Sequence, residues 1–249
     1  MLDYLILAVA GLAAGVVNTM AGGGTFLTFP ALVLTGVPPV MANATSTVAV
    51  FPGYLAGALG FRAELRTLAR AQLLRLTGIA LAGGLVGSLL LLVSSNEAFS
   101  AIVPFLLFLA TLAFLYGNVL RDWAARRARS VTPEGAAGLF LVCLYGGYFN
   151  GGLGIVLLAL FALWGWTDIH LMNGVKMAMS FALSAISVVT FAVAGLVAWP
   201  QALVMMIFAV IGGYAGAWVA RAVSPRVVRG VVVVIGFGMS AVFFVRLFL

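Results

Sequence analysis

One lysine is the residue of this chain whose position most clearly indicates chemistry. Lys176 is the only lysine, and it lies inside an apolar segment. A cation buried in a membrane helix is costly unless it is paired, solvated or able to reach the interface. No acid is available to pair with it, because the acids all stand near segment ends: Asp3, Glu64, Glu97, Asp122, Glu134 and Asp168. A bound anion is its natural partner, and the alternative is that its side chain extends to the membrane surface.

Four asparagines stand at corresponding places in the two halves of the chain. The halves read GVVNTMAGGGTFLTFPALVLTGVPPVMANATSTVAV and GGYFNGGLGIVLLALFALWGWTDIHLMNGVKMAMS. In each half an asparagine precedes glycines and a short apolar piece, and a second asparagine opens a long segment. Asn18 pairs with Asn150 and Asn43 with Asn173, at spacings of 25 and 23 residues. The repeat predicts two equivalent units.

Both glycine breaks could expose hydrogen-bond donors to an anion. A half-helix that starts after Gly22-Gly23-Gly24 or after Gly151-Gly152 directs its positive end toward the break. Amide and hydroxyl groups nearby can also donate. The candidate substrate-binding residues are Asn18, Thr19, Gly22, Gly23, Gly24, Thr25, Asn43, Thr45, Ser46, Thr47, Asn150, Gly151, Gly152, Asn173 and Lys176. The alternative is interhelical hydrogen bonding by the polar residues and close packing by the glycines.

Two further polar residues precede Lys176 in the second half. Asp168 and His170 could form a gate or a proton relay, although Asp168 is also a suitable helix cap. One histidine and one cysteine give no metal site, and no cofactor is expected. Ser180 and Ser184 have no histidine in helical register. The sequence therefore does not predict an enzyme.

The composition predicts that all these residues lie within a membrane. Hydrophobic residues make up 64% of the 249-residue chain and charged residues 8%, whereas soluble domains are about 25% charged. The apolar segments are 4–20, 25–36, 40–61, 76–94, 98–120, 135–150, 153–165, 170–195, 201–221 and 227–248. About 20 apolar residues span a bilayer, so 25–36 and 153–165 are short for a crossing. Each of these two follows a glycine break.

Arginine clusters orient the segments. The clusters are Arg62, Arg66, Arg70 and Arg75; Arg121, Arg126, Arg127 and Arg129; and Arg221, Arg226 and Arg229. An even number of segments separates successive clusters, so all three fall on one side, which the positive-inside rule assigns to the cytoplasm. The same parity places both termini in the periplasm of a bacterial inner membrane. This explains the basic charge better than nucleic-acid binding does.

The expected fold is an all-α integral membrane protein of two inverted repeats. Each repeat is a broken or re-entrant hairpin plus three transmembrane helices, which gives about eight membrane helices by the usual counting of such transporters. Three crossings are an odd number, so the second repeat is inverted relative to the first. The predicted units are a first repeat over 1–120, a cytoplasmic basic linker over 121–134 and a second repeat over 135–249.

The first half resembles the sulfite exporter TauE/SafE family. The resemblance is most specific over residues 11–66, in AGVVNTMAGGGTFLTFP, GVPP, NATST and GFR followed by Glu64. Gly147 to Gly154 and Asn173-Gly174 fit the second block less closely, because this segment is poorer in glycine. The resemblance implies export or exchange of small anions, often sulfite or organosulfonates, across a bacterial inner membrane.

The sequence therefore predicts a secondary transporter that moves small oxyanions by alternating access. Inverted repeats with broken helices place such sites near the bilayer midplane. The rivals are an anion channel of the same fold and a membrane assembly factor without transport. The expected partners are the anionic substrate and the lipid bilayer, with no nucleic acid. A homodimer is left open.

Overall fold

The computed structural model describes residues 1–20, 23–127, 135–222 and 225–248, and this part of the chain is helical with no strands. The helices are α1 (Leu2–Met20), α2 (Thr25–Leu34), α3 (Pro39–Gly60), α4 (Arg62–Leu65), α5 (Arg70–Val93), α6 (Asn96–Leu115), α7 (Gly117–Arg126), α8 (Ala136–Tyr148), α9 (Leu153–Leu163), α10 (Ile169–Val193), α11 (Trp199–Ala222) and α12 (Pro225–Phe248). In these ranges α5, α6 and α10 are long and apolar enough to cross a membrane. The expectation of a helical membrane protein is confirmed.

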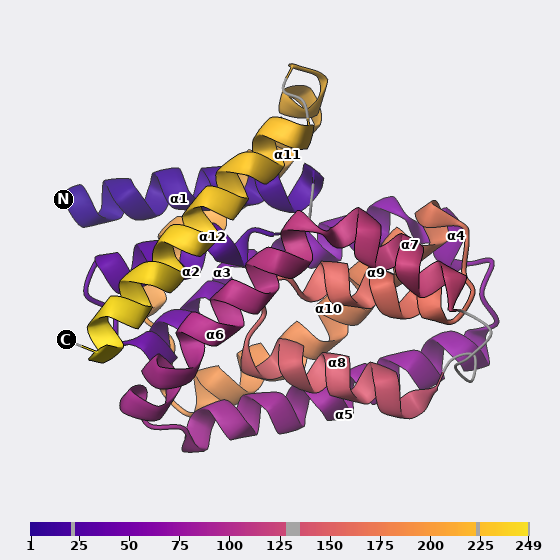
Figure 1. The fold of residues 1–249 in the computed structure, drawn as a ribbon, viewed down its shortest axis with the longest axis horizontal. Helices are drawn as coiled ribbons and strands as arrows, with labels where there is room; N and C mark the ends of the chain where they lie inside the picture. Colours follow the sequence, from indigo (N-terminus) through magenta and orange to yellow (C-terminus); the bar gives the residue numbers. More distant parts are fainter. Residues whose placement is uncertain (21–22, 128–134, 223–224, 249) are drawn as a thin grey trace.

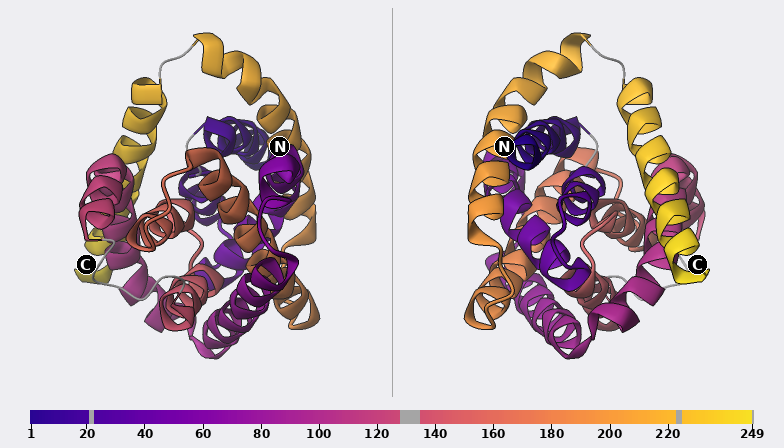
Figure 2. Two further views of the ribbon diagram at one scale, coloured as in Figure 1. Left: turned by 90° about the vertical axis from the view of Figure 1, so that its right-hand side faces the viewer. Right: turned by 90° about the vertical axis from the view of Figure 1, so that its left-hand side faces the viewer.

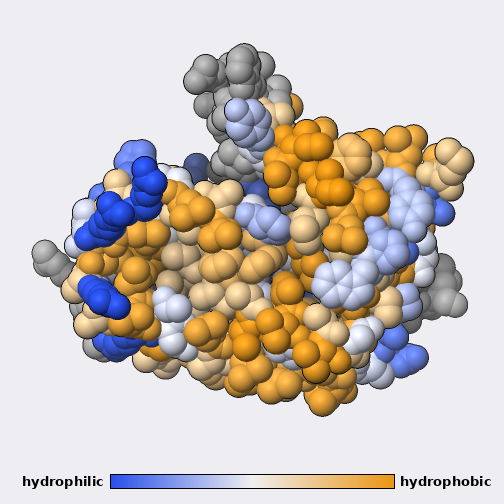
Figure 3. Space-filling model, turned by 180° about the vertical axis from the view of Figure 1, so that it is seen from behind, coloured by the Kyte–Doolittle hydropathy of each residue, from blue (hydrophilic) through white to orange (hydrophobic). Residues whose placement is uncertain are grey.

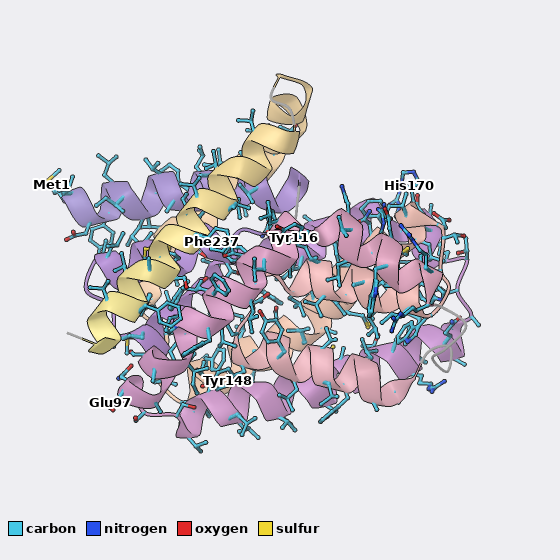
Figure 4. The ribbon with its side chains drawn as sticks, in the orientation of Figure 1. Met1, Glu97, Tyr116, Tyr148, His170 and Phe237 are labelled. Carbon is cyan, nitrogen blue, oxygen red and sulfur yellow. The ribbon has the colours of Figure 1, made fainter. Side chains whose placement is uncertain are left out.

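The long axis of the molecule has two distinct ends (Figure 1). Met1 and Glu97 lie at one end, which we call the termini end because α1 begins and α12 ends there. His170 lies at the opposite end (Figure 4), where α4 and the start of α5 carry exposed arginines. We call this the arginine end. Space-filling atoms show the hydrophilic residues gathered at the ends and an apolar surface between them (Figure 3). Such a surface is suited to lipid.

Two short helical hairpins enter the molecule from opposite ends (Figure 1). The pair α1 and α2 is open at the termini end, and the pair α8 and α9 is open at the arginine end. Each hairpin turns back near the middle of the long axis, at a glycine break. The helices α2 and α9 have only 10 and 11 residues, and at about 1.5 Å per residue neither could span a bilayer.

The two short helices end in the same way, and the reason is local. Gly36 and Gly165 have positive φ angles of 86° and 84°, a conformation that glycine adopts without steric cost. The N–H of Gly36 donates to Val33, and that of the next residue donates to Leu32. Gly165 and its successor donate to Ala162 and Phe161 in the same pattern. This is the Schellman arrangement, which stops a helix and releases the chain into the next element.

Capping residues set the starts of the following long helices. Pro39 stands in the first turn of α3, where a missing N–H is harmless. The Ser95 side chain accepts from the Ala98 N–H at the start of α6, and Asp168 accepts from the N–H groups of His170 and Leu171 at the start of α10. Asp168 therefore serves as a cap, one of its two predicted uses.

Glycines allow two pairs of helices to approach closely. Gly11 of α1 faces the Met205 carbonyl of α11, where an added Cβ would lie 2.6 Å from that oxygen. Gly83 of α5 faces the Phe140 carbonyl of α8, at 2.7 Å. Small residues at such positions let helix backbones meet. The helix α12 packs against α6, whereas α11 packs against α1. The helices α11 and α12 therefore lie on opposite flanks of the molecule (Figure 2).

One expected crossing is divided. The segment 98–120 was predicted as a continuous helix, but α6 ends at Leu115 and α7 begins at Gly117. A Cβ on Gly117 would lie 3.2 Å from the Ile155 side chain of α9, so the absence of a side chain lets α7 pack there. The basic stretch predicted over 121–134 is helical as far as Arg126, and residues 128–134 lie outside the described part of the chain.

Candidate functional site

The second break is the place where the two hairpins meet. It lies between the end of α8 at Tyr148 and the start of α9 at Leu153, and Gly152 takes a positive φ of 75° there. The Tyr54 hydroxyl of α3 donates to Asn150 Oδ1 at 3.0 Å, and Asn150 Nδ2 donates to Ser184 Oγ of α10 at 3.4 Å. The Thr25 side chain, at the start of α2, interacts with the same Tyr54 hydroxyl. One tyrosine thus contacts both breaks.

Backbone oxygens of the second break also have side-chain partners. Asn43 Nδ2 donates to the Tyr148 carbonyl at 2.8 Å. The Tyr145 hydroxyl donates to the Gly151 carbonyl. Phe149 packs edge-on against Phe29 of α2, with ring centroids 5.8 Å apart. The break is therefore buried between α2, α3 and α10 and does not face lipid.

The first break is closed by its own residues. Asn18 Oδ1 accepts from the Gly24 N–H at 2.9 Å. A Cβ on Gly24 would lie 2.9 Å from Asn18 Cγ, which explains why glycine is needed there. The Thr28 and Ser46 hydroxyls lie 2.6 Å apart and tie α2 to α3. Gly22 and the Thr19 side chain lie outside the described part of the chain.

The polar residues at the start of α3 are occupied by the protein itself. Thr45 Oγ1 accepts from the Ala198 N–H at 3.0 Å, and Thr47 Oγ1 donates to the Asn43 carbonyl. Asn43 Oδ1 is buried and has no hydrogen-bond partner among the residues that the structure describes. Of the predicted residues on this helix, Asn43 is the one that reaches the second break. Thr45 and Ser46 join helices, as the alternative interpretation of the sequence expected.

Lys176 lies apart from the breaks, nearer the arginine end. Its side chain is only 7% exposed, and Nζ donates to Asn173 Oδ1 at 2.8 Å. Within the described residues no carboxylate lies within ion-pair distance of Nζ. The sequence placed this lysine inside an apolar helix, and its side chain is buried there. Since Asn173 precedes Lys176 by one turn, the lysine side chain leans back toward the start of α10.

A stripe of buried polar residues continues from Lys176 along α10. Ser180, Ser184 and Ser187 follow at helical spacing, and all three are buried. Ser184 is the residue that accepts from Asn150. At about 1.5 Å per residue, Lys176 and Ser184 are roughly 12 Å apart along the axis. The stripe thus connects the lysine with the second break.

A cavity of about 380 Å³ lies beside this region and is lined in part by Tyr54. Its wall is mostly apolar and includes Asn18, Tyr54, Gly57, Met177, Gly213 and Tyr214. Asp168 and His170 are exposed at the arginine end and do not line it. Among the residues with described placement, no cluster of three or more His, Cys, Asp or Glu could hold a metal ion.

The sequence interpretation missed Tyr54, Tyr145 and Ser184. A signal for two of them was present in the repeat. Tyr54 follows Asn43 by 11 residues, and Ser184 follows Asn173 by 11 residues. Eleven residues are close to three helical turns, so each lies on the same face as its asparagine. Nothing in the local pattern distinguishes Tyr145 from an ordinary packing residue.

Comparison with known proteins gives the chain its relatives. Residues 7–243 match the family described as Sulfite exporter TauE/SafE. A probable membrane transporter protein of Haemophilus influenzae is 29% identical over 95% of this chain and 92% of its own length. The probable membrane transporter protein ORF9 of a Sinorhizobium species is 26% identical over 93% and 88%, and YfcA of Escherichia coli K12, also a probable membrane transporter protein, is 25% identical over 92% and 84%. No solved structure matches.

Proposed function

This chain belongs to the sulfite exporter TauE/SafE family of membrane transporters, as residues 11–66 led us to expect, and we propose that it exports or exchanges small oxyanions by alternating access. The observation that carries the proposal is the buried meeting of the two breaks at Tyr54 and Asn150. Sulfite and organosulfonates are the substrates that the family name and the donor groups favour. The chain carries them as a secondary transporter, without an enzymatic step.

The proposed mechanism needs two halves that can exchange roles, and the helix contacts support this. Under the repeat, α1 corresponds to α8 and α5 to α11. The helices α1 and α11 pack together, and so do α8 and α5, each pair through glycine. Each half therefore places one helix against the hairpin of the other half. This contact pattern supports the proposed inverted repeat, in which rocking about a shared axis alternates access.

The proposed site has neutral donors at its centre and one cation at its inner approach. The Asn150 amide and the Ser184, Tyr54 and Thr25 side chains surround the meeting point. Lys176 lies eight residues before Ser184 on α10 and supplies the positive charge that attracts an anion. Because the lysine has no described acidic partner, a bound anion lowers the cost of its burial. Of the other predicted donors, Gly23, Gly151 and Gly152 belong to the breaks, whereas the Gly24 N–H is held by Asn18 and the Asn173 amide donates to the Ile169 carbonyl.

The polar faces of α3 and α10 suggest a route across the membrane. The polar residues from Asn43 to Thr47 lie in the first half of α3, and the polar stripe of α10 begins at Lys176 in its first half. The two helices run in opposite directions: Gly57 faces Met177, and Phe61 faces Gly174. Asn43 and Thr47 therefore lie toward the termini end, and Ser180 and Lys176 toward the arginine end. We place the arginine end in the cytoplasm and both termini in the periplasm of the inner membrane. An inside-negative potential then favours anion exit.

Flux through reconstituted protein tests the proposal. The purified chain is placed in liposomes loaded with sulfite, methanesulfonate, sulfate or chloride, and release is followed with and without an imposed potential. We expect release of sulfite or methanesulfonate that saturates with concentration and rises with an inside-negative potential. Folded protein that carries none of these anions would overturn the proposal and favour an assembly role. Unitary currents in planar bilayers would show that the protein is an anion channel of the same fold and not a carrier.

A further inference from the structure

The second break contains oxygen atoms that would repel an anion. Where a helix is interrupted, carbonyl groups lose their helical partners together with the N–H groups. Tyr148, Asn150 and Gly151 each bring such an oxygen to the break: two backbone carbonyls and one side-chain amide oxygen. A carbonyl oxygen accepts hydrogen bonds and attracts cations. A bare break is therefore ambiguous, because it offers donors and acceptors together.

Each of these three oxygens receives a hydrogen bond from a different side chain. Asn43 donates to the Tyr148 carbonyl, Tyr54 to Asn150 Oδ1, and the Tyr145 hydroxyl to the Gly151 carbonyl. The three donors come from two helices, α3 and α8, and none belongs to the break itself. A fourth oxygen, the backbone carbonyl of Asn150, also accepts, from the Leu153 N–H at 3.3 Å, whereas Asn43 Oδ1 has no partner within the described residues.

The donors of the same break remain available. No hydrogen bond occurs, within the described parts of the chain, at the N–H groups of Gly151, Gly152 and Gly154. The Asn150 amide nitrogen has two N–H groups, and one of them is engaged by Ser184. Tyr54 determines this orientation, because its hydroxyl fixes Oδ1 on one side and thereby turns Nδ2 to the other. Without that hydroxyl the amide could rotate and present its oxygen.

We propose that Tyr54, Tyr145 and Asn43 are positioning residues that make the second break selective for anions. They cover three of its acceptor oxygens and leave its glycine N–H groups unpaired, so that a deprotonated oxyanion is held while a metal cation finds fewer oxygen ligands. The inference rests on the proposed function and deepens it. It assigns selectivity to side chains that need not touch the substrate, and in particular to two tyrosine hydroxyls.

Tyrosine-to-phenylalanine variants test this inference, because they remove one hydroxyl and keep the ring. Tyr54→Phe, Tyr145→Phe and the double variant are reconstituted as full chains beside Tyr116→Phe, whose side chain is exposed at the junction of α6 and α7. We expect Tyr54→Phe to raise the half-saturating methanesulfonate concentration about tenfold, since a buried acceptor loses its partner. The maximal rate should change much less, and Tyr116→Phe should match the wild type.

A second readout separates selectivity from simple loss of structure. A sodium methanesulfonate gradient across the liposomes sets up a potential whose sign reports which ion moves. The double variant should shift that potential toward sodium, whereas a loosened but unselective fold would only lower the rate. Wild-type flux with unchanged half-saturation and potential in the tyrosine variants would overturn the inference and leave the transport proposal standing. Wild-type protein without anion flux would overturn both.

Discussion

The two breaks stand at corresponding places in the halves, but their asparagines are used in opposite ways. Asn18 Oδ1 accepts from Gly24 of its own break. Asn150 Oδ1 accepts from Tyr54 on another helix, and its amide nitrogen faces Ser184 on a third. The first break is thus closed locally, and the second is held by the surrounding protein. The repeat specifies where the chain is interrupted, whereas tertiary partners decide which groups remain for a ligand.

The same contrast extends to the position three residues after the second asparagine of each half, which is Ser46 in the first half and Lys176 in the second. Ser46 meets Thr28 and attaches the short helix α2 to α3. Within the described residues, Lys176 Nζ donates to Asn173 on its own helix, and no hydrogen bond from it links α9 to α10. One position serves as a fastening in the first half and as a source of charge in the second. Corresponding positions of the sequence repeat therefore carry different chemistry in the two halves.

Removing the lysine charge should have the largest effect on transport. Lys176→Met keeps a long apolar side chain but leaves an arriving anion without a cation, and we expect anion flux to fall on the order of a hundredfold. Stability should not fall with it, because an unpaired buried charge is itself costly. Flux in liposomes and the thermal unfolding midpoint are measured together.

The matched control for this variant is Arg66→Met, which removes an exposed cation at the arginine end. It should keep most of the flux. Normal anion affinity in Lys176→Met would show that the lysine is not part of the site. Its charged group would then serve to reach the membrane interface. A large loss of stability with normal flux would give it a structural role.

The two glycine seams should respond alike, which tests the equivalence of the halves. Gly11→Ala and Gly83→Ala each place a Cβ less than 3 Å from a carbonyl oxygen of the facing helix. Each should lower the free energy of unfolding by about 1–3 kcal/mol through overpacking. Gly78→Ala is the control on α5, because its Cβ would meet no atom within 4 Å. Unequal costs at the two seams would argue that the halves are packed differently.

Substitution of Asn18 and Asn150 compares the two breaks directly. Asn18→Asp keeps the oxygen that accepts from Gly24, whereas Asn150→Asp replaces the nitrogen that donates to Ser184. Both add negative charge near the proposed site, so both should weaken anion flux, but Asn150→Asp by about tenfold more. Half-saturating sulfite concentration is the measurement. Equal losses would mean that charge alone matters and that the two amides are interchangeable.

Much of the fold was predictable because its causes are local. Apolar length predicts the helices, and the glycine-rich breaks predict two short helices that turn back. The division at Tyr116 was not predictable, because it depends on contact between Gly117 and Ile155 from a distant element. The same limit applies to the site. Asn150 and Lys176 stand out by type and place, but a tyrosine such as Tyr145 shows its use only when α8 has folded beside the break.

The smallest expected effect concerns the contact between Thr28 and Ser46, which has no counterpart between α9 and α10 in the described part of the chain. Thr28→Val removes the hydroxyl that meets Ser46 and keeps the shape of the side chain, so the free energy of unfolding should fall by about 1 kcal/mol. Thr190→Val is the control, because its hydroxyl donates only to the Ile186 carbonyl of its own helix. If α2 moves as part of a gate, Thr28→Val should also speed anion exchange, whereas Thr190→Val should not. Exchange at the wild-type rate would show that α2 is held by packing, and the moving element would then be the less fastened hairpin of α8 and α9.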